Sequence, residues 1–183
     1  DISPQKAIIK NNLFKEISKV VKTSIFTGFS FVFLGLNINP IYAQINSDNT
    51  TNTIVNQNNN QFDITGGILS QDGTNLFHSF SQFGLTSNQI ANFLANPNLH
   101  NILGRITGGD PSFINGLIQV TNGNSNIYLM NHAGIIFGNN TSLNVPADFT
   151  ATPATGITFG DQYFNSIGDN IYANLISNPT GFI

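Results

Sequence analysis

From residue 62 onward, the sequence is a succession of short apolar runs, each of three to six residues and each closed by Gly, Asn, Asp or Pro. The runs are rich in Ile, Val, Phe, Tyr and Thr, the residue types that favour β-strands. Many short strands are compatible with a sandwich, a barrel or a β-solenoid. The corners between the runs are only one or two residues long, and such brevity favours stacked coils. The pattern therefore predicts an all-β chain organised as a β-solenoid.

Two local patterns predict exceptions to this succession of coils. Residues 86–94 carry apolar side chains at the i, i+3, i+4 spacing of a helix, and the segment begins with Thr86 and Ser87, either of which could cap it. We expect one or two helical turns there. The pair Asn122-Gly123 is the one clear candidate for a two-residue hairpin turn.

Asparagine is the commonest corner residue, with twenty-five copies between residues 44 and 183. Asn tolerates the left-handed backbone conformation better than most non-glycine residues. Its amide both donates and accepts hydrogen bonds, so Asn side chains in successive coils can bond to each other and to the turning backbone. A row of Asp residues would repel itself instead. We therefore predict that Asn residues stack in register at the corners.

Charge is scarce and unevenly distributed. Only 8% of residues are charged, against about a quarter in an average soluble protein. All five lysines lie between residues 6 and 22, and beyond them Arg105 is the one cation among seven Asp residues. The part after residue 43 therefore has no basic patch for a phosphate backbone, which argues against nucleic-acid binding. The absence of Cys excludes disulfides, thiolate zinc sites and a Cys nucleophile.

The first 43 residues have the order of a secretory signal peptide. Lysines come first, an uncharged apolar run follows from Ile25 to Ile38, and the small residue Ala43 precedes Gln44 at a plausible cleavage point. The alternative is an amphipathic or membrane-anchoring helix. We predict a helical signal peptide at 1–43 and a polar, flexible or poorly packed segment at 44–61. The β-solenoid domain should then occupy residues 62–183. We expect it to be the truncated front part of a longer product, because no obvious cap follows the last run.

Candidate catalytic and metal-binding residues are few. His78, His100 and His132 have no metal-ligand spacing; we expect His78 to be packed structurally and His132 to be exposed at a turn. Four aspartates could in principle serve a hydrolase, but all have turn-like neighbours: Asp110, Asp148, Asp161 and Asp169. Arg105 could pair with Asp110, face a partner or lie at the surface. We predict no enzyme activity, no cofactor, no metal and no small-molecule substrate.

Four sequence blocks, in one order, resemble a known family. These blocks are residues 75–83 (NLFHSFSQF), the tetrapeptide Asn96-Pro97-Asn98-Leu99, the stretch 102–116 (ILGRITGGDPSFING), and Asn131-His132-Ala133-Gly134-Ile135 followed by Phe137-Gly138. Together they resemble the N-terminal secretion domain of two-partner secretion exoproteins of the filamentous haemagglutinin type, in a style similar to cyanobacterial members. The fourth block departs from the family's Asn-Pro-Asn-Gly-Ile pattern, since His132 replaces Pro and Ala133 replaces Asn. Proline would fix φ near −65°, a restriction that His132 does not impose on this turn.

The resemblance implies a right-handed parallel β-helix with short N-terminal capping strands. It implies a secretion signal and folding nucleus that the Sec translocon delivers to the periplasm. An outer-membrane pore of the Omp85 (TpsB) type would bind the domain through POTRA modules, and the product would be secreted or reach the cell surface. The residues implied in transporter recognition are Asn96, Pro97, Asn98, Leu99, Asn131, Gly134 and Ile135. The alternatives are a carbohydrate-acting β-helix enzyme and a purely structural surface solenoid.

Overall fold

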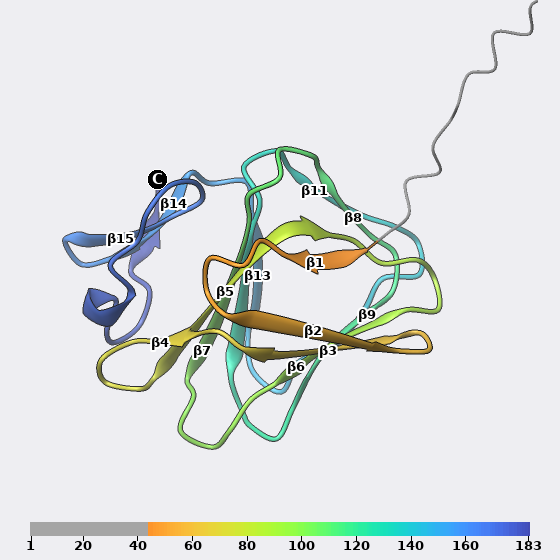
Figure 1. Cartoon of the computed structure of the whole chain (residues 1–183), viewed down its shortest axis with the longest axis horizontal. Helices are drawn as coiled ribbons and strands as arrows, with labels where there is room; N and C mark the ends of the chain where they lie inside the picture. Colours follow the sequence, from red (N-terminus) through yellow and green to blue (C-terminus); the bar gives the residue numbers. More distant parts are fainter. Residues whose placement is uncertain (1–43) are drawn as a thin grey trace, which may run out of the picture. The chain divides into compact units, whose positions relative to one another are not determined.

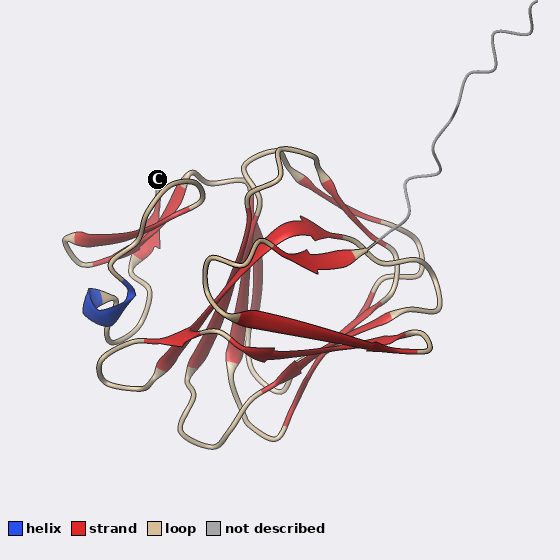
Figure 2. Cartoon of the chain, viewed as in Figure 1, coloured by secondary structure: helices blue, strands red, loops and turns tan. Residues whose placement is uncertain are grey.

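The computed structural model describes residues 44–183 (Figure 1). The predicted signal peptide, including Ala43, lies outside the described residues. Within the described part, strands and their connections form nearly everything, and one 3-10 turn is the sole helical element there (Figure 2). In that same part no helix is long and apolar enough to cross a membrane.

Three parallel sheets form the body of the domain, as expected for stacked coils. Sheet A contains the parallel strands β5 (Asn75–Phe83), β7 (Asn101–Ile106), β10 (Asn126–Met130) and β13 (Phe149–Thr152). Sheet B contains β3 (Gln61–Gly66), β6 (Ile90–Leu94), β9 (Leu117–Thr121) and β12 (Ser142–Asn144). Sheet C pairs β8 (Ser112–Ile114) with β11 (Ile135–Phe137). The chain visits A, C and B in turn, so the predicted parallel β-helix is confirmed.

Antiparallel strands cap the N-terminal end of the coils, also as predicted. β1 (Ile45–Ser47) and β4 (Ile68–Leu69) both pair with the free edge of β5, while β2 (Thr53–Asn58) forms a hairpin with β3. The segment 44–61, expected as flexible or poorly packed, therefore contributes two strands to this cap. Most of its Asn and Gln side chains are exposed, whereas Thr51 and Thr53 are buried and Ile45 belongs to the main core.

Sheet A is buried on both faces, and this explains its continuous apolar runs. Along β7, Ile102 and Ile106 point into the coils and join the main core, while Leu103 points outward into a second cluster. All six residues of β7 are buried. Residues of a strand alternate between the two faces of its sheet, so a run without polar alternation indicates cover on both sides.

The outer cover of sheet A comes from the last 28 residues, which we name the C-terminal clasp (156–183). It comprises β14 (Gly156–Phe159), β15 (Gln162–Asn165), the 3-10 turn η1 (Tyr172–Asn174) and β16 (Gly181–Phe182). β14 pairs antiparallel with both β15 and β16. In Figure 1 the clasp is drawn in blue beside sheet A. Its apolar side chains pack against outward-facing residues of sheet A in the second cluster.

Two local predictions were wrong. Residues 86–94 form no helix: Gln89 N donates to Thr86 O in a turn, and the rest is strand β6. Pairing with β3 on one side and β9 on the other outweighs the helical spacing of a short segment. Asn122-Gly123 forms no hairpin, because β9 and β10 belong to different sheets. Asn122 does adopt the left-handed conformation, with φ of 65°, but at a corner between coils.

Candidate functional site

A row of three asparagines begins the strands of sheet A. Asn75, Asn101 and Asn126 occupy equivalent positions in the registers of β5, β7 and β10. Asn126 Nδ2 donates to Asn101 Oδ1 over 2.9 Å, and Asn101 Nδ2 donates to Asn75 Oδ1 over 2.8 Å. The predicted stacking of corner amides is therefore confirmed at this position.

Both ends of the asparagine row bond to backbone. Asn75 Nδ2 donates to the carbonyl oxygens of Leu175 and Ser177 in the clasp, at 2.8 and 2.7 Å. At the other end, Asn126 Oδ1 accepts from Asp148 N over 3.0 Å. Asn75 and Asn101 are fully buried. Buried amides with complete partners stabilise one register, because any slip would leave them unsatisfied.

The first predicted recognition motif forms an exposed turn between β6 and β7. Leu99 N donates to Asn96 O over 3.1 Å, and Asn98 N donates to the side-chain Oδ1 of Asn96 over 2.9 Å. Pro97 occupies the second position, where its fixed φ suits this turn. Asn96, Pro97 and Asn98 are exposed, whereas Leu99 is buried in the main core. The motif thus anchors one apolar side chain and presents three residues to solvent.

The second motif makes the same turn between β10 and β11 without its proline. Gly134 N donates to Asn131 O over 2.9 Å, and Ala133 N donates to Asn131 Oδ1 over 3.0 Å. The turn therefore persists with His132 and Ala133 in place. Unlike Asn96, Asn131 is fully buried, and its Nδ2 donates to Asp110 O and Ser112 Oγ, both at 3.0 Å. A folded domain cannot present this amide to a partner.

The structure does not bring the two motifs together. Asn96 precedes a strand of sheet A, and Asn131 follows one. Because these strands are parallel, the motifs lie at opposite ends of the sheet, separated by about one strand length, roughly 16 Å for five residues. Ile135 is half-buried against the main core, and Gly134 has a φ of 108°. Gln44, at the predicted cleavage point, is exposed, and its carbonyl accepts from Gly84 N.

Arg105 lies at a junction that the sequence did not indicate. It projects from the outer face of β7 and is only 4% exposed. Nε donates to Ser79 Oγ at 2.8 Å, and Nη1 donates to the clasp carbonyls of Gly168 and Asn165 at 2.6 and 3.1 Å. The suggested pairing with Asp110 is wrong, because Asp110 lies in the exposed corner beyond β7. Arg105 instead joins two coils to the clasp.

Asp48 completes this junction from the N-terminal cap. Its carboxylate accepts from Ser79 Oγ at 2.5 Å, from Thr107 Oγ1 at 3.0 Å and from both N and Oγ1 of Thr50, at 2.9 and 2.7 Å. Burial acts to raise the pKa of Asp48, but these hydrogen bonds outweigh it and hold the pKa below its ordinary value. Ser79 thus connects the carboxylate to Arg105 by one bridging hydroxyl.

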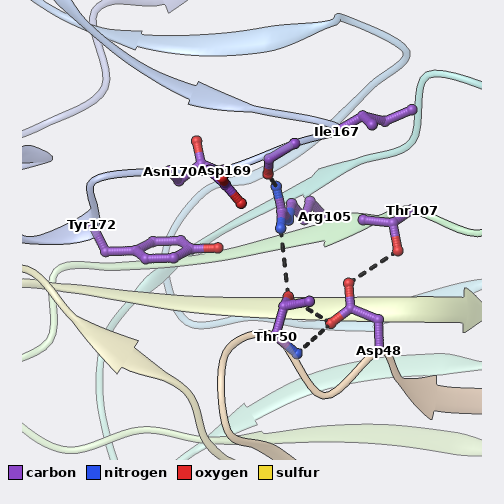
Figure 3. A pocket seen from close by; sticks show the side chains of 9 residues that line it. Asp48, Thr50, Arg105, Thr107, Ile167, Asp169, Asn170 and Tyr172 are labelled. Carbon is purple, nitrogen blue, oxygen red and sulfur yellow. Dashed lines mark hydrogen bonds between the residues drawn. The ribbon is translucent and has the colours of Figure 1, made fainter.

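A cleft of about 500 Å³, whose lining includes Asp48, Thr50 and Arg105, opens beside this junction between the N-terminal cap and the clasp (Figure 3). Arg105 Nη2 faces Thr50 Oγ1 across it at 3.5 Å. Burial raises the pKa of Tyr172, which lines the opposite wall. The polar groups at the base of the cleft bind mainly one another, so the arrangement is suited to joining chain segments.

His78 is packed in the core, as expected. It is 1% exposed, Nδ1 lies 3.1 Å from Thr53 Oγ1, and Nε2 has no hydrogen-bond partner among the described residues. Phe80 and Phe93 flank the ring. Burial lowers the pKa of His78 to about 3, because the charged form would lose its hydration. The imidazole is therefore neutral in the folded domain.

The remaining candidates lie apart from one another. His132 is half-buried, not exposed as expected, and its Nδ1 lacks a partner in the described part of the chain. The four aspartates considered for catalysis are all exposed, in different connections between strands. Over residues 44–183, no group of three acidic or His side chains could hold a metal ion. No local pattern indicates the roles of Asp48, Ser79 and the clasp, because the residues they contact are distant along the chain.

Comparison with protein families decides the classification. The family model of the TPS secretion domain matches residues 43–182. The chain belongs to the TPS secretion domain family. Neither the curated proteins nor the solved structures contain a match to it. As a TPS secretion domain, it is part of a secreted protein that is exported by a two-partner system with a TpsB partner. The match begins at residue 43, so the N-terminal cap belongs to the same domain as the coils.

Proposed function

We propose that this TPS secretion domain is the secretion signal and folding nucleus of a large surface protein of the adhesin type. After Sec-dependent delivery to the periplasm and cleavage between Ala43 and Gln44, an Omp85-type transporter binds the domain through its POTRA modules. The main support for this proposal is the family match together with one exposed motif turn, Asn96 to Asn98, at a corner of the coils.

The first motif has the properties of a recognition surface. Its backbone shape is fixed by two internal hydrogen bonds and a proline, so a partner would lose little conformational entropy on binding it. The side chain of Asn98 is exposed, and we propose that it contacts the transporter directly. The conformation of the turn follows from Asn96, whose Oδ1 is occupied by Asn98 N.

The second motif has a different role in this proposal. We propose that the corner between sheets A and C is held by Asn131, Gly134 and Ile135. The side-chain amide of Asn131 makes its hydrogen bonds inside the fold. These three residues would affect secretion by setting the shape of the third coil. Direct contact of Asn131 with a transporter would require an unfolded chain.

The role of folding nucleus is supported by the contrast between the two ends of the coils. Strands β1, β2 and β4 cover the N-terminal end. At the other end, Phe137 and Leu143 are 46% and 49% exposed, on strands that stand last in their sheets among the described residues. A further coil could pair with these edges and bury these side chains, which is how solenoids extend.

The test measures release of the protein in cells that express residues 1–183 with or without a candidate TpsB transporter. We expect a fragment beginning at Gln44 in the medium only when the transporter is present. Asn98→Ala should reduce release severalfold with unchanged stability, because its backbone N–H and the turn remain. Asn139→Ala, at an exposed corner between β11 and β12, is the matched control.

Two results would contradict the proposal. Equal retention with and without the transporter would mean that the domain is not a functional secretion signal. Normal release of Asn98→Ala together with loss for Asn96→Ala would mean that the motif only shapes its turn.

A further inference from the structure

The clasp binds a surface that no single coil provides. On the outer face of sheet A, Phe77 comes from β5, Leu103 from β7 and Met130 from β10. These three side chains form one buried cluster with four from the clasp, namely Ile157, Phe159, Phe164 and Leu175. The ring of Phe77 lies 5.1 Å from that of Phe164 and 5.3 Å from that of Tyr172. This apolar stripe exists only when three coils are stacked in register.

The polar contacts of the clasp depend on stacking in the same way. Asn75 donates to the carbonyls of Leu175 and Ser177, and Asn101 Nδ2 donates to both Asn75 Oδ1 and Asn178 Oδ1, the latter at 3.1 Å. Arg105 supplies the bonds to Asn165 and Gly168. A coil shifted by one residue would turn these donors to the inner face of the sheet, and the clasp carbonyls would lose their partners.

The clasp also makes the longest-range contacts of the domain. Neighbouring coils join residues 25 or 26 positions apart, as in the asparagine row, whereas Asn75 reaches Leu175 and Ser177 across 100 and 102 positions. Loop closure becomes less favourable as separation grows. The clasp contacts require both the closure of a long loop and an assembled surface. They therefore form after that surface.

We propose that the C-terminal clasp is a latch that closes last, on correctly stacked coils, and then sets the lifetime of the folded domain. Until it closes, the coils can exchange with less ordered states and the apolar stripe on sheet A stays open. After it closes, the coils cannot separate without first releasing the clasp. The latch is a property of folding alone and does not rest on recognition by a transporter.

The test is a comparison of folding and unfolding rates for residues 44–183, which contain every described strand and both clusters. Leu175→Ala removes a buried clasp side chain, and Ile118→Val, inside sheet B, is the control in the coils. We expect Leu175→Ala to accelerate unfolding by about thirtyfold or more while refolding changes less than twofold. Ile118→Val should slow refolding measurably.

Asn178→Ala provides a milder variant if Leu175→Ala does not fold, because Asn178 is exposed and loses only its bond to Asn101. Hydrogen exchange of this variant should be faster for amides of β14 and β15 than in the unmodified domain, with β7 and β10 unchanged. Slower refolding of Leu175→Ala in proportion to its loss of stability would overturn the proposal. So would equal acceleration of exchange in the clasp and the coils. Export of these variants is measured separately from their folding rates. Failure of the proposed secretion function can therefore be distinguished from failure of the latch proposal.

Discussion

Asn101 Nδ2 donates to Asn75 Oδ1 over 2.8 Å, and this bond joins the first two coils at the place where both strands of sheet A begin. The same amide also accepts from Asn126 and donates to Asn178 of the clasp. One side chain therefore connects three coils and the segment that covers them. In each of its three side-chain hydrogen bonds, an amide N–H meets an amide oxygen.

We expect Asn101→Ala to lower the free energy of unfolding by about 2–4 kcal/mol, because the buried amide of Asn75 and the half-buried amide of Asn126 would lose their partner. Urea denaturation of residues 44–183, followed by circular dichroism, measures the effect. Asn139→Ala, at an exposed corner, should change stability by less than about 0.5 kcal/mol. Equal effects for the two variants would show that the row does not stabilise the stack.

The buried His78 predicts a loss of stability in acid. Its pKa is lowered from 6.5 to about 3 in the folded state, so the unfolded chain binds a proton that the folded domain excludes. Stability due to a neutral His78 is complete above about pH 6.5, and it falls by about 1.4 kcal/mol per pH unit as the pH decreases toward 3.

His78→Gln isolates this effect, because glutamine is neutral throughout and can still bond to Thr53. We expect the difference in unfolding free energy between the variant and the unmodified domain to shift in favour of the variant below pH 6. Contributions from the aspartates cancel in this difference. Parallel stability curves from pH 7 to pH 4 would contradict the assignment.

Asp48 should also make the domain less stable as the pH falls, although it is an acidic group and His78 is a basic one. Its folded-state pKa is lowered, so its stabilisation is present above its unfolded pKa and is lost as the pH falls through the folded value. We expect Asp48→Asn to destabilise the domain by about 1–3 kcal/mol at pH 7, since hydrogen bonds to a carboxylate are weakened. The destabilisation should shrink toward pH 3. A constant difference at all pH values would argue that only the shape of the side chain matters.

The second motif turn forms without a proline and should become more stable when one is introduced. We expect His132→Pro to raise the free energy of unfolding by about 0.4–1 kcal/mol, because the turn conformation suits proline and the unfolded chain loses freedom. It also removes the unpartnered buried Nδ1 of His132. Ala133→Pro is the matched contrast: it removes the N–H that bonds to Asn131 Oδ1 and should destabilise. Thermal unfolding midpoints compare the two.

The parts of the site that follow from adjacent residues could be predicted. The turns at Asn96 and Asn131 are closed by hydrogen bonds within four residues, so the local sequence contains all their partners. The partners of Arg105 could not be predicted. Its clasp carbonyls lie 60 and 63 positions away, and a backbone carbonyl has no sequence signature.

The sequence by itself determined that this chain forms stacked coils, because apolar runs closed by Asn and Gly specify strand length and corner chemistry locally. Only the tertiary structure decided where residues 86–94 belong, since pairing with β3 and β9 overrides a weak helical preference. It also decided that the clasp folds back over sheet A. That surface is assembled from three coils and becomes available only once they stack.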